Sequence, residues 1–130
     1  MSVTYECDIG AALTTAFKLH WPDLHRSWIH IPNGAFLAGD ARSRAVQIAK
    51  LNREGMQVGA SDYLIAVQRG SYPGMFLEIK RSGYKPTINQ LLFIEDMREQ
   101  GYHAVWRAGF DSSWAAVVDY MSLKNRKEKT

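Results

Sequence analysis

Cysteine, clustered histidine and long apolar runs are scarce in this 130-residue sequence, and each shortage excludes a class of protein. Cys7 is the single cysteine, so no internal disulfide forms, and we expect a reducing, cytoplasmic location. A structural zinc site needs clustered ligands, whereas the four histidines are scattered: His20, His25, His30 and His103. No stretch approaches the roughly 20 apolar residues of a membrane helix. The first ten residues carry acids and no apolar run, so we expect no secretion signal.

The chain has the size and apolar content of one folded domain with a real core. Its 16 Lys and Arg residues outnumber 13 Asp and Glu, which fits a polyanionic partner without requiring one. Part of the excess lies in a basic tail over residues 123–130, after a domain expected to span residues 1–122. A solvated terminus and a nucleic-acid contact are equally good readings of its basic residues, Lys124, Arg126, Lys127 and Lys129.

Apolar periodicity and capping residues predict four helices. The first is expected over residues 4–20, with Pro22 ending it, and the second over residues 40–54, with Asp40 as N-cap. The third is expected over residues 87–100. The last should begin at Asp111 or Ser112 and bury Trp114, Val117, Val118 and Met121.

Four β-prone segments lie between these helices, at residues 27–31, 63–67, 75–80 and 103–107. The segment at 63–67 is apolar on both faces, which predicts a central strand. The order α-β-α-β-β-α-β-α predicts an α/β fold with a mixed central sheet flanked by helices.

The strand MFLEIK at residues 75–80 carries the unusual chemistry. Glu78 and Lys80 lie two residues apart, so they share one face of a strand that has little room for charge. Their Cα atoms are expected roughly 7 Å apart. An E-x-K pair on a strand is also common as a surface ion pair, so the pair by itself does not establish a site.

A second carboxylate strengthens the functional reading. Asp62 directly precedes the neighbouring strand, and hairpin pairing of the two strands would bring it to Glu78. Two close carboxylates repel each other, and a divalent cation relieves that repulsion. Oxygen ligands of this kind suit Mg²⁺ or Mn²⁺. The chemistry that follows is phosphodiester hydrolysis, in which Lys80 orients water or stabilises charge in the transition state.

These motifs resemble the VRR-NUC branch of the PD-(D/E)xK nuclease superfamily. The resemblance runs from about residue 6 to residue 121 through the stretches HIPNG, EGMQVGASDYL, FLEIK, TINQ and GYHAV. It implies a restriction-endonuclease-like core and a stand-alone, viral-type enzyme that depends on Mg²⁺ or Mn²⁺. It also implies cleavage of branched DNA, such as four-way junctions or flaps, by a homodimer.

The resemblance assigns roles to further residues. Gln90 would help hold the attacking water or Lys80, although Thr87-x-x-Gln90 is also a capping box. Glu6 would approach the metal, although an acid in a first helical turn also suits the helix dipole. The backbone carbonyl of Ile79 is expected to be a metal ligand. One departure from the family pattern is Ser61, which stands where a proline is usual.

The candidates for contacts to DNA are basic residues near the motifs, namely Arg42, Arg44, Arg81 and Lys85. Taken one at a time, each favours an ordinary surface residue over a phosphate contact. Arg69 lies in a loop, and Asn33 and Gly34 follow a family-like strand. The four tryptophans sit in or beside apolar segments, which favours core packing over base stacking.

Two other readings remain open. The chain could be a DNA-binding module without catalysis, or a structural dimer whose charged strand forms an interface salt bridge.

Overall fold

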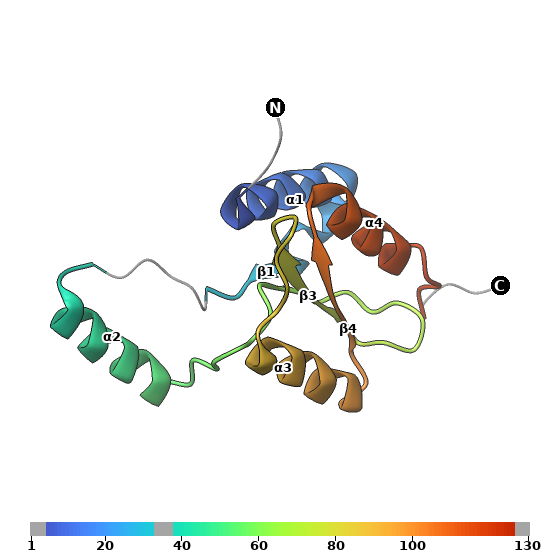
Figure 1. Ribbon diagram of the computed structural model, residues 1–130. Helices are drawn as coiled ribbons and strands as arrows, with labels where there is room; N and C mark the ends of the chain where they lie inside the picture. The colour runs from blue at the N-terminus through green and yellow to red at the C-terminus, as the bar shows by residue number, and fades with distance from the viewer. Residues whose placement is uncertain (1–4, 33–37, 127–130) are drawn as a thin grey trace.

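A four-stranded mixed sheet forms the centre of the computed structural model, which describes residues 5–32 and 38–126. The strands are β1 (Trp28–His30), β2 (Tyr63–Ile65), β3 (Met75–Lys80) and β4 (His103–Ala108), in that order across the sheet. The first three pair antiparallel, and β4 runs parallel to β3. Helices α1 (Glu6–His20) and α4 (Phe110–Met121) lie on one face, and α3 (Ile88–Glu99) lies on the other (Figure 1). The predicted α/β fold with a mixed central sheet is therefore confirmed.

The alternating side chains of β3 join the two halves of the core. Met75, Leu77 and Ile79 pack with residues of α1 and α4 in the larger apolar cluster. Phe76 points to the opposite face, where it packs with Ile94 of α3. Glu78 and Lys80 follow Phe76 in the period-two pattern of a strand, as predicted.

Glycine allows two close approaches that position the sheet. A Cβ on Gly10 of α1 would collide with the Tyr63 hydroxyl oxygen, and one on Gly59 would lie 2.5 Å from the carbonyl oxygen of Asn89. Gly59 also has a φ of +85°, which residues other than glycine rarely adopt. Because these two positions lack a side chain, α1 packs closely against Tyr63 of β2, and the segment before Asp62 packs closely against Asn89 of α3.

Several details of the secondary structure differ from the predictions. A short 3-10 helix, η1 (Pro22–Ser27), follows α1 and was not predicted. Strand β2 has three residues rather than the predicted five. Its partner β1 also has three rather than five, so the two strands pair at only three positions. Helix α4 begins at Phe110 after Gly109, not at Asp111 or Ser112, and it buries Ala116 and Tyr120 as well as Val117 and Met121.

The remaining helix, α2 (Ala41–Arg53), stands away from the sheet (Figure 1). Asp40 caps it as predicted, since its side chain accepts a hydrogen bond from the Ser43 amide. No residue of α2 is buried, so this helix does not contribute to the layers that flank the sheet. The amphipathic pattern reports a helix but not what it packs against.

Several sequence-based predictions fall outside the described residues, namely those on Thr4, Asn33, Gly34, Lys127 and Lys129. The start of the basic tail is described, and its main chain is bound to the turn after β2. The carbonyl oxygen of Lys124 accepts from the Gly70 amide, and the amide of Arg126 donates to the Gln68 side chain. In residues 5–32 and 38–126, no helix has the length and apolar character needed to cross a membrane.

Candidate active site

Strand register brings Asp62 to Glu78. Tyr63 of β2 pairs with Leu77 of β3, so the residue before Tyr63 lies opposite the residue after Leu77. The main-chain carbonyl of Asp62 accepts from the Ile31 amide at 2.7 Å, which extends the pairing with the β1 segment. Its side chain Oδ2 accepts from the main-chain N–H of Ile79 at 2.8 Å. The carboxylate of Asp62 is therefore held at the same end of the sheet as Glu78.

Glu78 is a buried carboxyl group with an unsatisfied oxygen. Its exposed fraction is 2%, and Oε1 has no hydrogen-bond partner among the described residues. Burial raises the pKa of Glu78 to about 9, with a further contribution from the neighbouring Asp62 carboxylate, against a smaller opposing effect of Lys80. Without a cation, this carboxyl group is protonated at neutral pH.

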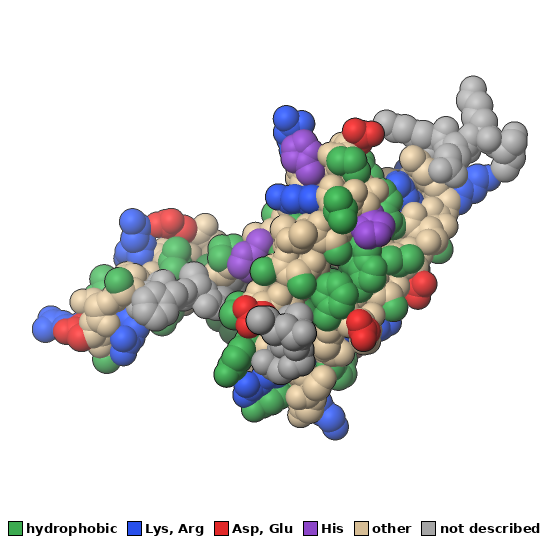
Figure 2. Space-filling model, turned by 90° about the horizontal axis from the view of Figure 1, so that it is seen from above, with side chains coloured by type: hydrophobic (Ala, Val, Ile, Leu, Met, Phe, Trp, Pro, Cys, Tyr) green, Lys and Arg blue, Asp and Glu red, His purple; other side chains and the backbone are tan. Residues whose placement is uncertain are grey.

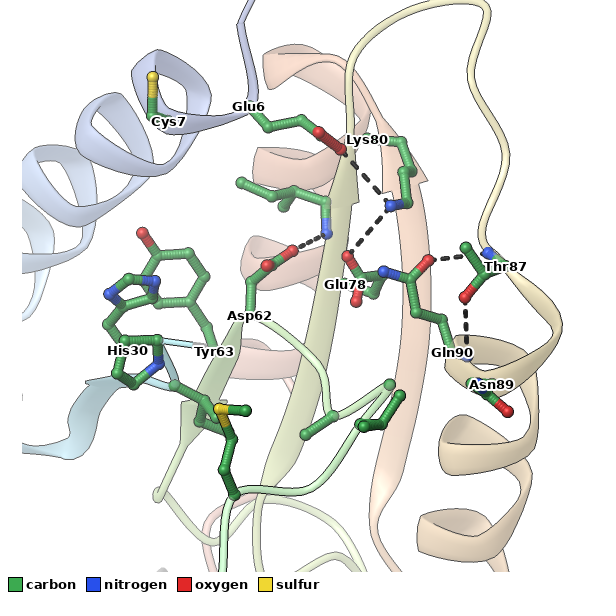
Figure 3. A pocket seen from close by; sticks show the side chains of 17 residues that line it. Glu6, Cys7, His30, Asp62, Tyr63, Glu78, Lys80, Thr87, Asn89 and Gln90 are labelled. Atoms are coloured by element: carbon green, nitrogen blue, oxygen red, sulfur yellow. Dashed lines mark hydrogen bonds and ion pairs between the residues drawn. The ribbon is translucent and has the colours of Figure 1, made fainter. Parts of the chain in front are cut away.

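Lys80 lies between two acids (Figure 3). Its Nζ is 3.7 Å from Oε2 of Glu78 and 3.5 Å from Oε1 of Glu6. Only 13% of the Lys80 side chain is exposed, whereas 43% of the Glu6 side chain is exposed. Glu6 thus faces the site from α1, and in this structure it contacts the lysine. Its role as a metal ligand stays a prediction.

The donor set fits a hard cation that keeps part of its water shell. Among the described residues, no group of three His, Cys, Asp or Glu side chains is placed to hold a metal ion. Asp62 and Glu78 supply two carboxylates, and Mg²⁺ is typically bound by one or two carboxylates together with water and substrate phosphate. The C=O of Ile79 points to the same side of β3 as its N–H, which is the side of Asp62. The unsatisfied Oε1 of Glu78 is the atom that such an ion would satisfy.

Gln90 forms the predicted capping box, and it also lines the cleft. Its Oε1 accepts from the Thr87 amide at 2.8 Å, and its own amide donates to Thr87 Oγ1 at 3.3 Å, which completes the capping box at the start of α3. The side-chain nitrogen is directed toward Glu78 (Figure 3). One amide group therefore caps the helix with its oxygen while its nitrogen stays available to the site.

A cleft of about 720 Å³ surrounds these groups. It is lined by Glu6, Asp62, Glu78, Lys80 and Gln90 together with Cys7, His30, Ile31, Pro32, Met56, Val58, Gly59, Ala60, Tyr63, Ile79, Thr87 and Asn89. Its volume leaves room beside the carboxylates for a group larger than a metal ion.

His30 and Tyr63 line the cleft, although the sequence did not predict them as site residues. The two residues pair directly in the β1–β2 register, and their ring centroids are 5.0 Å apart. The available signal was the position of Tyr63 directly after Asp62. Finding His30 required the strand register, which three-residue strands do not reveal.

The predicted DNA-contacting residues fall into two groups. Arg81 and Lys85 lie in the loop between β3 and α3, next to Lys80, where the Arg81 guanidinium covers the Tyr84 ring at 3.9 Å. Arg42 and Arg44 lie on α2. None of these four basic residues is among those that line the cleft. Arg69 has a structural partner instead, since its Nε donates to the Met121 carbonyl.

The tryptophans pack as predicted. Trp28 is buried in the core against Phe17 and Tyr63. The other three are partly buried and pack against the two apolar clusters: Trp21, Trp106 and Trp114.

Comparison with known proteins shows which fold this arrangement of helices and strands belongs to. No family model matches the chain, and no curated protein matches it. A solved structure described as a "VRR_NUC domain protein" superposes with a TM-score of 0.78 and 25% sequence identity, over 92% of this chain and 90% of that one. The chain has a VRR-NUC domain fold. The resemblance noted in the sequence is thereby confirmed at the level of the fold, and the acids and lysine described above lie in the cleft of this VRR-NUC fold.

Proposed function

We propose that the chain is a divalent-metal-dependent endonuclease that hydrolyses phosphodiester bonds in branched DNA, such as four-way junctions or flaps. The observation that carries the proposal is the buried Glu78, whose Oε1 is unsatisfied beside Asp62 and Lys80. A buried carboxyl group beside a half-buried acid and a lysine lowers the stability of a fold, so stability by itself does not account for this arrangement. The nuclease-type fold and the cleft around the three groups support a catalytic use of them.

Each residue has a distinct task in this proposal. Asp62, Glu78 and the Ile79 carbonyl would hold a Mg²⁺ or Mn²⁺ ion, and the Ile79 amide fixes the Asp62 carboxylate. Such an ion would supply Lewis acidity toward a phosphate oxygen and would lower the pKa of a bound water molecule. Lys80 orients that water or stabilises the charge that develops on the phosphate. Glu6 holds the lysine from the other side, and the nitrogen of Gln90 donates toward the reacting groups.

The acids argue against a DNA-binding module without catalysis. Carboxylates in a phosphate-binding groove oppose binding unless a cation neutralises them. The reading of Lys80 as an interface salt bridge is also weakened, because both acids near its Nζ belong to the same chain.

The test is cleavage of end-labelled synthetic four-way junction, flap and linear duplex in Mg²⁺, Mn²⁺ or EDTA. We expect metal-dependent cutting of a branched substrate in preference to the duplex. Glu78→Ala and Lys80→Ala should each slow it about 100-fold or more. The controls are Asp119→Asn and Lys18→Ala, which change exposed charges on α4 and α1. DNA binding without cleavage in any metal would favour the module instead, and equal cutting by all variants would refute the site.

A further inference from the structure

The loop between β3 and α3, residues 81–86, begins and ends at the cleft. It follows Lys80 and precedes Thr87, both of which line the cleft (Figure 3). Tyr84 is three residues from Thr87, so the Cα atoms of these two residues lie within roughly 11 Å of each other. That distance is about three base steps along a DNA strand, at ~3.4 Å per step. A side chain on this loop is therefore within reach of the nucleotides beside a phosphate bound in the cleft.

The aromatic ring of Tyr84 is held in one orientation and is open to solvent. The Arg81 guanidinium covers the ring at 3.9 Å from its centroid and donates a hydrogen bond to the Tyr84 hydroxyl. The Tyr84 amide donates to the Arg81 carbonyl, which closes a tight turn, and Gly83 supplies a φ of +89° at the third position of that turn. Tyr84 is nevertheless 52% exposed. Because the guanidinium covers one face, the exposed area lies on the other face and on the ring edges.

An open aromatic face of this kind is a stacking surface for an unpaired nucleobase. A base inside a duplex already has a neighbouring base on each face, so it cannot stack on a protein ring unless it first leaves the helix. A base at a flap or at an open branch point has one face available. The ring of Tyr84 therefore offers a contact that branched DNA can make and continuous duplex cannot.

We infer that Tyr84 stacks on an unpaired nucleobase of the DNA beside the cleft, and that Arg81 holds the ring from behind. The inference rests on the proposed function, because it names the contact by which the same cleft selects branched DNA over duplex. Arg81 is then a positioning residue for the ring and not a phosphate contact. Lys85, which is exposed next to Tyr84, supplies the charge of the loop.

Phosphate contacts alone do not provide this selection. Duplex and branched DNA present the same backbone, and contacts to phosphate carry no sequence information. On the face of the body shown in Figure 2, the basic side chains are spread apart and do not gather into one patch. A stacked base adds affinity only where a base is unpaired, which is the property that distinguishes a flap from a duplex.

The test is fluorescence anisotropy of a labelled flap and of a labelled linear duplex, titrated with the full chain in EDTA. Tyr84→Leu keeps an apolar side chain but removes the ring, so it should raise the Kd for the flap about tenfold and that for the duplex less than about twofold. Tyr84→Phe keeps the ring and should leave both Kd values within about twofold. Arg81→Lys keeps the charge but loses the planar guanidinium, so it should raise the Kd for the flap about threefold or more and leave the duplex unchanged.

The matched control is Lys85→Gln, which removes a charge from the same loop and should weaken flap and duplex by the same factor. A flap preference that survives Tyr84→Leu would overturn the inference, as would a Tyr84→Phe variant that behaves like Tyr84→Leu, or a Lys85→Gln variant that loses the preference. An Arg81→Lys variant that binds the flap normally would overturn the positioning role of Arg81.

Cleavage of the same flap in Mg²⁺ separates this inference from the proposed function. The expected binding pattern in a chain that cuts no DNA would support the stacking role and refute the nuclease. Normal cutting together with an equal loss of flap and duplex affinity in Tyr84→Leu would refute the stacking role alone.

Discussion

The main-chain N–H of Ile79 donates to the Asp62 carboxylate at 2.8 Å. This bond links the residue between Glu78 and Lys80 to the residue that precedes β2, so a main-chain group orients the acid. Main-chain donors on a central strand move little, because the strand is hydrogen-bonded to β2 and β4 on its two sides. The site is therefore preorganised before any ion or substrate arrives.

The protonated Glu78 makes the metal-free protein less stable as pH rises. The pKa of this group is about 9 in the folded chain against an ordinary value of 4.5, so the folded state holds a proton that the unfolded state has lost. Its contribution is complete below about pH 4.5 and is lost as pH rises toward 9, at up to ~1.4 kcal/mol per pH unit. Urea unfolding in EDTA at pH 6, 7 and 8 measures the slope. Glu78→Gln should flatten it, and equal slopes for the two proteins would contradict the raised pKa.

Substitution of Lys80 separates catalysis from ion binding. Lys80→Met removes a positive charge 3.7 Å from Glu78 Oε2 while keeping a similar side-chain length. We expect cleavage to fall about 100-fold or more, whereas Mn²⁺ binding stays equal or becomes tighter because a competing cation is gone. Single-turnover cleavage and calorimetric titration of Mn²⁺ give the two readouts. Loss of both together would mean that Lys80 maintains the structure of the site instead.

The two roles of Gln90 can be separated by a pair of variants. Thr87→Ala removes the hydroxyl that caps α3 but leaves the glutamine amide, so it should lower the free energy of unfolding by about 1 kcal/mol without slowing cleavage. Gln90→Glu preserves the capping box but replaces the nitrogen directed at Glu78 with an acceptor, so it should slow cleavage about tenfold or more at nearly unchanged stability. If Gln90→Glu cuts at the normal rate, the residue serves only as a cap.

Local patterns were sufficient to predict most of the fold and the central part of the site. Capping residues located α2 and α3, and the alternation in MFLEIK assigned Glu78 and Lys80 to one face. Asp62 could be placed because it directly precedes a strand that pairs with β3.

Features that depend on tertiary packing were not predictable in this way. The contact of Glu6 with Lys80 joins residues far apart in sequence, and neither the helical pattern nor the resemblance predicted it. Gly109 starts α4 without a side-chain cap, where sequence favours Asp111 or Ser112. The isolation of α2 is a property of its surroundings, because periodicity reports which side of a helix is apolar but not what covers it.

Ser61 is a buried residue that the site does not require. It is fully buried, and its hydroxyl oxygen has no hydrogen-bond partner among the described residues. An unpaired buried hydroxyl costs roughly 1–3 kcal/mol, so Ser61→Ala should leave the free energy of unfolding unchanged or raise it by about 1 kcal/mol. Cleavage should be unaffected, since the hydroxyl contacts none of the acids. Urea unfolding checks this, and a loss of more than about 1 kcal/mol would reveal a partner for the hydroxyl.

Titration of Mn²⁺ into the DNA-free protein at pH 7 tests the central claim most directly, because it asks whether the Asp62–Glu78 pair holds a divalent cation. Calorimetry in two buffers of different ionisation enthalpy reports binding and proton release together. We expect Mn²⁺ to bind with release of about one proton, since Glu78 is protonated before the ion arrives. Glu78→Gln should abolish both the binding and the release, whereas Asp119→Asn should change neither. Absence of binding to the unchanged chain, or equal binding by Glu78→Gln, would contradict the account.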